Sequence, residues 1–256
     1  MTSASAIRIR ELLIIGAGGF GAVAASIADS MNAAAIHHHG AGRWEVIGYA
    51  DCDAAKRGTR HAERVVHGTI EQARRAFQGR PLWFFCAIGD NRARAEMARR
   101  ALKCGWTPAT LVHPSAILDR TAEIGGGSFV GPLVVVSWKA RIGAHVVVDA
   151  HVSIGHNAVL MDFCEVFAGA RINGNCQVGE SALVGCNGTL LPGTVVGCGA
   201  VVGANSLAHG VVAPDTTIVG APPRIIRRGK NLFSGPPRTW AAMEANHGEG
   251  DSDQGQ

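Results

Sequence analysis

His156 is the residue whose type and position best suit acid–base chemistry. It follows Ile154 by two positions, and Ile154 belongs to a series of aliphatic residues that recurs every six positions. Because such a series faces a core, a position two further on lies at a corner, where an imidazole can face outward and find hydrogen-bond partners. An unperturbed imidazole titrates near ~6.5, which suits a general base at neutral pH. The alternative is an exposed corner histidine with no role, since the chain has 11 His in all.

A second pattern that could bind a ligand is Gly-x-Gly-x-x-Gly, formed by Gly16, Gly18 and Gly21. It follows an apolar segment and precedes a helical one, as in turns that hold the phosphates of a dinucleotide at a helix N-terminus. The acidic residue expected about twenty positions further on is late, since Asp51 is the candidate. Residues 32–42, with an alanine run and three adjacent histidines, are interpreted as a loop insertion that explains the delay.

Metal and cysteine chemistry are less favoured by the spacing. His151 and His156 have the separation of two zinc ligands, as in a carbonic anhydrase on a β-helix, and His113 would be the third ligand. Residues in phase on one face of such a helix differ by multiples of eighteen, however, and His113 is two residues out of phase with His151. Cys164 and Cys176 occupy small inward positions and are interpreted as core residues rather than nucleophiles. No metal is expected.

The first half of the chain, residues 7–112, alternates between segments typical of strands and helices, which predicts a small parallel sheet with crossover helices of Rossmann-like type. The predicted strands are 9–15, 45–50 and 82–87, and the predicted helices are 22–31, 70–77 and 92–104. Residues 12–28 carry no charge and imitate a signal peptide. They are too short for the ~20 residues of a membrane span and contain several glycines, so a strand, a turn and a helix are the better interpretation.

From Leu118 onward the sequence has a period of six. The aliphatic positions are Leu118, Ile124, Val130, Val136, Ile142, Val148, Ile154, Leu160, Val166, Ile172, Val178, Val184, Leu190, Val196 and Val202. Small residues mostly precede each of them by two positions, and a glycine often follows directly, where a corner would use its freedom at positive φ. Such repeats predict a parallel β-helix with three hexapeptides in each coil, hence about five coils over residues 113–226. Residues 227–256 are predicted to form a flexible tail.

The whole pattern resembles the hexapeptide-repeat acyltransferases with a left-handed parallel β-helix. Within them it is most similar to bacillosamine-pathway UDP-amino-sugar N-acetyltransferases and sialic acid O-acetyltransferases. The resemblance rests on the Gly-rich turn, on three further motifs and on the coils. The motifs are Ala87-Ile88-Gly89-Asp90-Asn91-Arg92, His113-Pro114-Ser115-Ala116 and Val219-Gly220-Ala221-Pro222-Pro223-Arg224. It implies a homotrimer that transfers an acyl group directly from acetyl-CoA to an acceptor, without an acyl-enzyme.

The resemblance also implies roles in catalysis. His156 would be the general base at the crevice between subunits, and Gly174 N–H would hold the oxyanion. Asn157 stands where the family often has an acid; an amide can orient the ring but adds no negative charge, so Asp149 or Asp162 would have to serve, or the base is weaker. Glu165 stands where some relatives have a second histidine near the acyl-CoA.

Binding residues follow from the same resemblance. Cys186, Ala204 and Arg224 would contact coenzyme A, the last through its phosphates. The nucleotide-sugar acceptor would lie against the Gly-rich turn and the ends of the sheet, and its contacts would be Gly16, Gly18, Gly19, Phe20, Asp51 and Asn91. Phe20 replaces a histidine found in some relatives, which leaves the identity of the sugar open.

The predicted function is therefore acetyl-CoA-dependent N- or O-acetylation of a nucleotide-linked amino sugar for a surface glycan. A composition of 47% hydrophobic residues supports a large core, and the scattered basic residues behind the net charge of +4 give no nucleic-acid interface. Seven cysteines without a Cys-x-x-Cys pair favour a reducing cytoplasm. The alternatives are the zinc enzyme above, a non-catalytic trimeric scaffold, and a nicotinamide oxidoreductase; Tyr49 is the single tyrosine and forms no Tyr-x-x-x-Lys, which excludes short-chain reductase chemistry.

Overall fold

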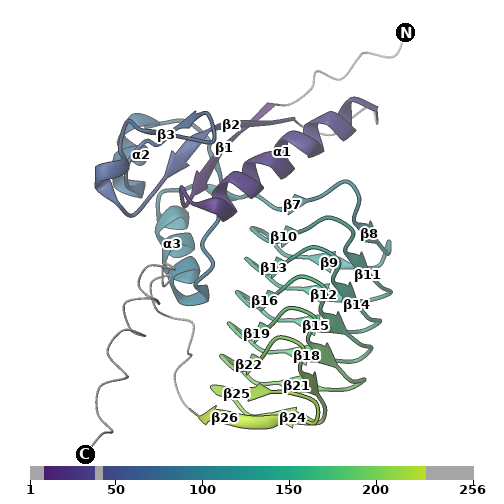
Figure 1. Ribbon diagram of the computed structural model, residues 1–256. Coiled ribbons are helices and arrows are strands. Elements are labelled where there is room, and N and C mark those ends of the chain that lie inside the picture. Colours follow the sequence, from purple (N-terminus) through teal and green to yellow (C-terminus); the bar gives the residue numbers. More distant parts are fainter. Residues whose placement is uncertain (1–8, 38–42, 229–256) are drawn as a thin grey trace, which may run out of the picture.

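The computed structural model describes residues 9–37 and 43–228, which form a sheet domain seated against one end of a three-sided β-helix (Figure 1). The sheet domain contains β1 (Ile9–Ile15), α1 (Gly19–His37), β2 (Arg43–Ala50), the 3-10 turn η1 (Ala54–Lys56), β3 (Arg60–His61), β4 (Arg64–Val65), α2 (Ile70–Ala76), β5 (Trp83–Cys86), α3 (Asn91–Lys103) and β6 (Thr107–Pro108). Its parallel sheet has the order β2-β1-β5-β6, and β3 and β4 form a separate antiparallel hairpin. The Rossmann-like fold class predicted for this half is confirmed.

Local sequence explains where the helices begin. Thr69 Oγ1 accepts a hydrogen bond from Gln72 N, and Gln72 Oε1 accepts one from Thr69 N, so α2 starts with a capping box. Asp90 accepts from Ala93 N at 2.7 Å and is the N-cap of α3. The apolar run of β1, residues 12–15, is buried on both faces, as expected for a strand that lies between β2 and β5 in a parallel sheet.

The predicted loop at 32–42 is wrong over its first part, because α1 continues to His37. The alanines at 33–35 are strong helix formers and favour continuation of the helix. The Asn32 side chain also donates to Trp44 O at 2.7 Å and accepts from Trp44 N at 2.8 Å, which ties the helix to the start of β2. Residues 38–42, with two of the three histidines, lie outside the described residues.

The β-helix is built from three sheets of very short strands (Figure 1). The first sheet contains β7 (Leu111–Val112), β10 (Phe129–Val130), β13 (Val147–Val148), β16 (Glu165–Val166), β19 (Leu183–Val184), β22 (Val201–Val202), β25 (Thr216–Val219) and the antiparallel β26 (Arg224–Arg228). The second contains β8 (Ile117–Leu118), β11 (Val135–Val136), β14 (Ser153–Ile154), β17 (Arg171–Ile172), β20 (Thr189–Leu190) and β23 (Leu207–Ala208). The third contains β9 (Glu123–Ile124), β12 (Arg141–Ile142), β15 (Val159–Leu160), β18 (Gln177–Val178), β21 (Val195–Val196) and β24 (Val211–Val212).

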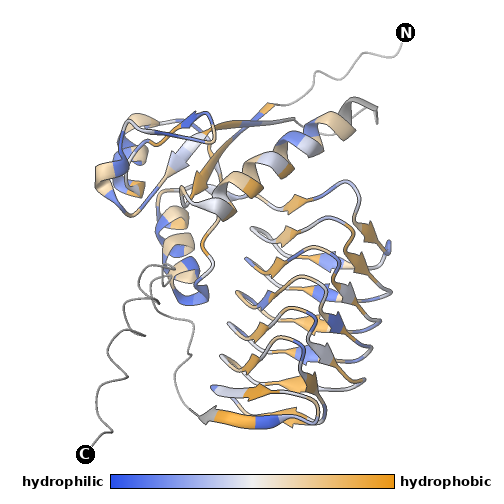
Figure 2. Ribbon diagram, viewed as in Figure 1, coloured by the Kyte–Doolittle hydropathy of each residue, from blue (hydrophilic) through white to orange (hydrophobic). Residues whose placement is uncertain are grey.

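The interior of this β-helix is the predicted aliphatic series. From Val130 to Val202 every member of the series is buried, and small residues such as Ala140, Cys164 and Cys176 fill the space between them. Figure 2 shows hydrophobic residues recurring in the strands of every coil. Since each inward side chain packs on its equivalents in the coils above and below, a slim aliphatic at every sixth residue is what holds the stack together.

The second and third sheets each have six strands, so the β-helix makes about six turns rather than the predicted five. The count of hexapeptides began at Leu118 and stopped at Val202, and it missed both ends. At the start, β7 already pairs with β10. At the end the repeat shortens: sixteen residues separate Val195 from its partner Val211, whereas eighteen separate partners such as Val159 and Gln177, so a strict step of six loses the phase.

The expectation that the glycine after each aliphatic residue has a positive φ is wrong. Residues three after the aliphatic position take the positive φ, among them Leu133 (φ 57), His151 (φ 60) and Asn157 (φ 56). The glycines directly after the aliphatic position are needed for space: a Cβ on Gly155 would lie 2.5 Å from Gly174 N of the next coil. Glycine is therefore required there by the close approach of neighbouring coils rather than by φ.

Candidate active site

The predicted catalytic residues lie together at one corner of the β-helix, between the second and third sheets. His156 is exposed there, and its Nε2 points at the coil beyond it, because a Cβ on Gly174 would lie 2.5 Å from that nitrogen. The N–H of Gly174 donates to no backbone carbonyl within the described ranges. The corner therefore presents an imidazole nitrogen and a free backbone donor to the same space, which is the geometry that proton removal and oxyanion binding need.

Asn157 is the neighbour that orients the imidazole. Its Nδ2 lies 3.1 Å from His156 Nδ1 and 3.3 Å from Asn175 Oδ1, so an amide pair runs along the corner beside the ring. The two carboxylates nearest in sequence are bound elsewhere. Asp149 accepts a hydrogen bond from Ala150 N at 2.7 Å, and Asp162 accepts one from Ala144 N at 2.8 Å.

A pocket of about 660 Å³ lies between the sheet domain and the first sheet of the β-helix. Its walls come from α1, from the segment after β5, and from strands and corners of five coils. The lining residues are Phe20, Val23, Gly89, Asp90, Phe129, Val147, Asp149, Glu165, Phe167, Leu183, Gly185, Cys186, Val201, Gly203 and Ala204. The pocket thus brings together four residues assigned to binding from the sequence, namely Phe20, Glu165, Cys186 and Ala204.

The Gly-rich turn is held by Asp51. Gly16 has φ +112 and no room for a side chain, because a Cβ would lie 2.5 Å from Ala87 O. Asp51 Oδ2 accepts from Ala17 N at 2.8 Å and from Lys56 Nζ at 3.0 Å. Burial alone would raise the pKa of Asp51, but the hydrogen bonds from Asp53, Lys56 and Ala17 outweigh it and hold the pKa below its usual range. An added Cβ at Gly18 or Gly19 would meet open space, so this part of the turn is free to approach a ligand.

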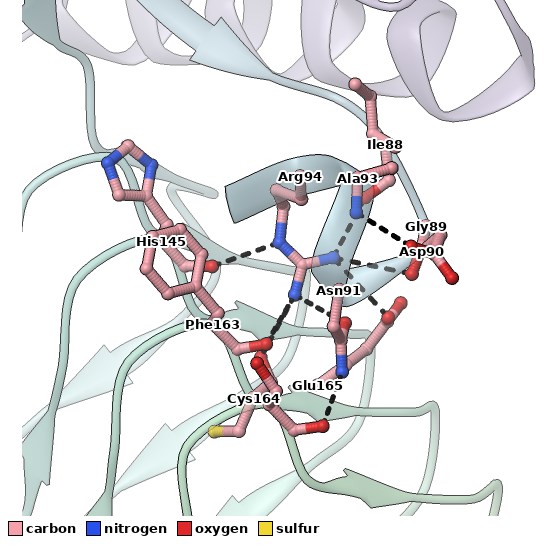
Figure 3. Close-up of polar contacts among 11 residues, drawn as sticks. Ile88, Gly89, Asp90, Asn91, Ala93, Arg94, His145, Phe163, Cys164 and Glu165 are labelled. Atoms are coloured by element: carbon pink, nitrogen blue, oxygen red, sulfur yellow. Dashed lines mark hydrogen bonds and ion pairs between the residues drawn. The ribbon is translucent and has the colours of Figure 1, made fainter. Parts of the chain in front are cut away.

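Asn91 and Arg94 of α3 form hydrogen bonds to the β-helix, and together they make a polar clasp between the two domains (Figure 3). Asn91 Nδ2 donates to Ser181 O at 3.1 Å, and Asn91 Oδ1 accepts from Arg94 Nη2 at 2.7 Å. Arg94 also donates from Nε to His145 O at 3.1 Å and from Nη2 to Phe163 O at 2.8 Å. The polar atoms of Asn91 are therefore engaged within the protein, and its predicted contact with an acceptor stays a prediction.

The comparisons with known proteins match this architecture. The PglD N-terminal domain family matches residues 11–101. The acetyltransferase domain of PglB from Neisseria gonorrhoeae FA1090 is 27% identical, with a TM-score of 0.72, and the match covers 85% of this chain and 100% of that one. Residues 11–101 therefore match the PglD N-terminal domain family, and the chain as a whole is similar to a sugar acetyltransferase domain built on the same fold.

Two further structures of this fold are similar. A mutant of perosamine N-acetyltransferase from Caulobacter crescentus, in complex with CoA and GDP-perosamine, is 23% identical, with a TM-score of 0.76 over 85% of this chain and 97% of that one. WeeI from Acinetobacter baumannii AYE is 21% identical, with a TM-score of 0.72 over 85% of this chain and 100% of that one. The PglB domain has also been crystallised with acetyl coenzyme A.

The remaining sequence-derived assignments do not meet at this candidate site. Arg224 is exposed on β26 at the far end of the β-helix and is not among the residues that line the 660 Å³ pocket. His151 and His156 lie at successive corners with β14 between them, and no three His, Cys, Asp or Glu side chains of the described residues group as metal ligands do. None of the helices in the described ranges is long and apolar enough to cross a bilayer.

Sequence reasoning missed Arg94, which is 1% exposed although it is charged. A signal was present in the helix pattern. Asn91, Arg94, Ala98 and Ala101 share the spacing of one helix face, and the small residues of that face indicate burial. An arginine on a buried face must find acceptors, and the structure supplies carbonyls of both domains.

Proposed function

We propose that the protein transfers the acetyl group of acetyl-CoA to an amino or hydroxyl group of a nucleotide-linked sugar. The observation that carries this proposal is the pocket shared by the two domains: the sheet domain contributes Phe20 beside the Gly-rich turn, and the β-helix contributes Cys186 and Ala204. The likeness to the PglB acetyltransferase domain, whose structure holds acetyl coenzyme A, supports the same assignment. The nucleotide would lie against Gly18 and Gly19, where α1 begins and where backbone N–H groups favour phosphate.

The mechanism is a direct transfer. His156 Nε2 accepts the proton of the sugar amine or hydroxyl while its nitrogen or oxygen attacks the thioester carbonyl carbon. The carbonyl oxygen becomes an oxyanion, which Gly174 N–H stabilises. When the tetrahedral intermediate collapses, the carbon–sulfur bond breaks and the imidazolium returns the proton to the coenzyme A sulfur. Acetylated sugar and free coenzyme A thiol leave, and the histidine is again neutral.

The active site needs a second copy of the chain. Within one chain, the pocket lies along the first sheet, whereas His156 lies at the corner beyond the second sheet, so one side of the β-helix separates them. Exposed apolar side chains lie on this side in the coils nearest the sheet domain, among them Ile117, Val135 and Trp138. A homotrimer that covers them would place His156 of one subunit beside the pocket of the next.

The test is release of coenzyme A thiol with a panel of UDP-, GDP- and dTDP-linked amino sugars. His156→Asn should lower the rate by about 100-fold or more, in line with the loss of a general base. His151→Asn is the matched control, because it makes the same change at the neighbouring corner, where asparagine tolerates the positive φ. The control should keep its rate, and both variants should keep the native molecular mass by light scattering. A rate of His156→Asn equal to the control would remove this histidine from the mechanism.

A further inference from the structure

Glu165 is the unusual group of the pocket. It is the outward residue of β16, it lines the pocket, and it is only 6% exposed. Its Oε2 has no hydrogen-bond partner among the residues that the structure describes. Buried carboxylates normally accept several hydrogen bonds, and an unsatisfied one is costly to keep. Oε2 is enclosed beside Arg94, so the oxygen that a molecule in the pocket could reach is Oε1, which makes no hydrogen bond with the described residues either and would be satisfied by a donor on a bound ligand.

Arg94 does not satisfy this carboxylate, although it lies beside it (Figure 3). Its Nη1 is 3.6 Å from Glu165 Oε2, which is an ion pair but too long for a hydrogen bond. The guanidinium is instead committed to backbone carbonyls of both domains: Nη1 donates to Ile88 O at 2.8 Å, and the other nitrogens donate to the β-helix. Arg94 therefore supplies positive charge to Glu165 while its donors serve the clasp.

The other carboxylates of the pocket each accept a backbone N–H with one oxygen and are less buried than Glu165. Asp90 accepts from Ala93 N at the start of α3, and Asp149 accepts from Ala150 N. Most of the remaining lining is aliphatic or aromatic, including Phe129, Phe167 and Leu183. Glu165 is thus the most deeply buried carboxylate that this largely apolar pocket offers to a bound molecule.

We propose that Glu165 accepts a hydrogen bond from a ring hydroxyl or amino group of the acceptor sugar and thereby selects sugars that carry a donor at that position. This rests on the proposed function, because it takes a nucleotide-linked sugar as the occupant of the pocket. Arg94 acts as a positioning residue: it fixes the carboxylate between the domains and favours its charged form. A sugar that lacks the donor would leave the carboxylate unpaired, which typically costs about 10- to 100-fold in affinity.

The binding should depend on pH around neutrality. Burial raises the pKa of Glu165 to about 7, against the pull of Arg94, and Asp149 and Asp90 raise it further. His145, on the far side of Arg94, has its pKa lowered to about 4 by burial and by Arg94, so it stays neutral over this range. The carboxylate form is the stronger acceptor, so the dissociation constant of the sugar should rise as the pH falls below about 7, by up to tenfold for each unit.

The experiment measures the dissociation constant by calorimetry, in the absence of acetyl-CoA, between pH 6 and 8. The probes are GDP-perosamine and the UDP- and dTDP-linked 4-amino-4,6-dideoxy sugars, together with analogues of the tightest probe that each lack one ring hydroxyl or the amino group. The variants are Glu165→Gln and Glu165→Asp, of which the second keeps the negative charge beside Arg94. Glu123→Gln is the matched control, because Glu123 is the outward residue of β9 on the opposite sheet and is exposed.

We expect one analogue to bind wild-type protein about 10- to 100-fold more weakly than its parent sugar, and to bind Glu165→Gln as well as the parent does. The pH dependence should disappear in Glu165→Gln and persist in Glu123→Gln. If the wild type binds nucleotide sugars but every analogue is weakened equally in wild type and variants, the role of Glu165 is wrong while the proposed function stands. If Glu165→Gln weakens coenzyme A and not the sugar, Glu165 belongs to the thioester site instead. If no nucleotide sugar binds the wild type, both proposals fail.

Discussion

At the scale of single residues, the orientation of His156 depends on an amide. Asn157 has φ 56, a conformation in which asparagine and aspartate are the favoured side chains, so either residue fits this corner. When the Asn157 Nδ2 donates to His156 Nδ1, the imidazole carries its proton on Nε2 and cannot accept another there. When the amide is turned, its oxygen accepts from Nδ1–H and Nε2 becomes the base. The amide therefore allows both tautomers, whereas a carboxylate allows the productive one alone.

Asn157→Asp should for this reason make the enzyme faster. The new carboxylate would accept from His156 Nδ1–H, leave Nε2 free to accept a proton, and stabilise the imidazolium that forms. We expect kcat/KM to rise by about threefold to tenfold near neutral pH, and its pH profile to shift toward higher pH. Asn205→Asp is the control, because it makes the same change at a corner with φ 54 whose side chain bonds to Asn187 and to neither His156 nor Asn157. A slower or unchanged Asn157→Asp would show that the amide already holds the productive tautomer.

Residue-scale prediction succeeded where it depended on periodicity. The count by six placed His156 at an outward corner, and the next equivalent corner, eighteen residues further, is Gly174. The sequence pattern could not predict the ion pair between Arg94 and Glu165, because that contact depends on how α3 packs against three coils of the β-helix. The sequence shows the pattern within each element, whereas the packing of one element on another is decided by side-chain shape at the contact.

At the scale of elements, the glycines of the β-helix set the spacing of the coils. Gly155→Ala would push a Cβ against Gly174 N, and the backbone of neither coil can yield without breaking its ladder. We expect this variant to lower the free energy of unfolding by about 2 kcal/mol or more, measured by chemical denaturation.

The matched control is Gly193→Asn, at the same corner two coils on. Gly193 has φ +75, and nothing lies near an added Cβ, while the equivalent positions of the two preceding coils are Asn157 and Asn175. The change should cost less than about 0.5 kcal/mol, because asparagine tolerates this conformation. Equal losses in the two variants would mean that backbone conformation, and not the contact between coils, decides which positions need glycine.

Element boundaries in the sheet domain were predictable where the apolar pattern is clear. The strands at 9–15 and 45–50 and the helix at 70–77 were placed within two residues of their observed bounds. The sixth turn of the β-helix was not predicted, because the last coil is two residues shorter than the others and the step of six fails there. The continuation of α1 to His37 was also not predicted, because the alanine run beside the histidines was interpreted as a loop from its composition. Helix propensity and the hydrogen bonds of Asn32 to Trp44 favour helix there.

At the scale of the whole molecule, the junction between the domains carries opposing charge effects. His145 stacks on Phe163 at 5.2 Å and on Phe84 of β5 at 5.9 Å. Its pKa is lowered to about 4, so below pH ~6.5 the unfolded chain gains a proton that the folded one does not, and stability falls as the pH falls toward 4. Glu165, with its pKa raised to about 7, acts in the other direction: stability falls as the pH rises from ~4.5 to 7.

His145→Phe should separate the two effects. Without the imidazole, the loss toward acid pH disappears and the contribution of Glu165 remains. We expect the free energy of unfolding of the variant, relative to wild type, to increase as the pH falls from 6.5 to 4.5, by about 1.4 kcal/mol for each unit at most. Urea denaturation at several pH values measures this slope, which is independent of any constant cost of the larger ring. A flat difference would place the proton uptake elsewhere.

A mixing experiment tests whether the site is shared between copies. His156→Asn removes the base, and Cys186→Trp would block the pocket, because Cys186 is exposed on its rim. Each variant alone should be inactive. After the two are denatured together and refolded in equal amounts, about a quarter of the interfaces would combine an intact histidine with an intact pocket, so activity should return to about a quarter of wild type. Activity that stays absent in the mixture would put both parts of the site in one chain.

The antiparallel strand β26 has a consequence for assembly. Every other pairing along the first sheet of the β-helix is parallel, so an uncovered last rung would present the same edge that each earlier rung offers to its successor. Because β26 reverses direction, it occupies the backbone donors and acceptors of β25 and offers no template for another coil. A chain that ends before Arg224 should therefore grow into filaments by stacking of successive molecules, at a rate that increases with protein concentration.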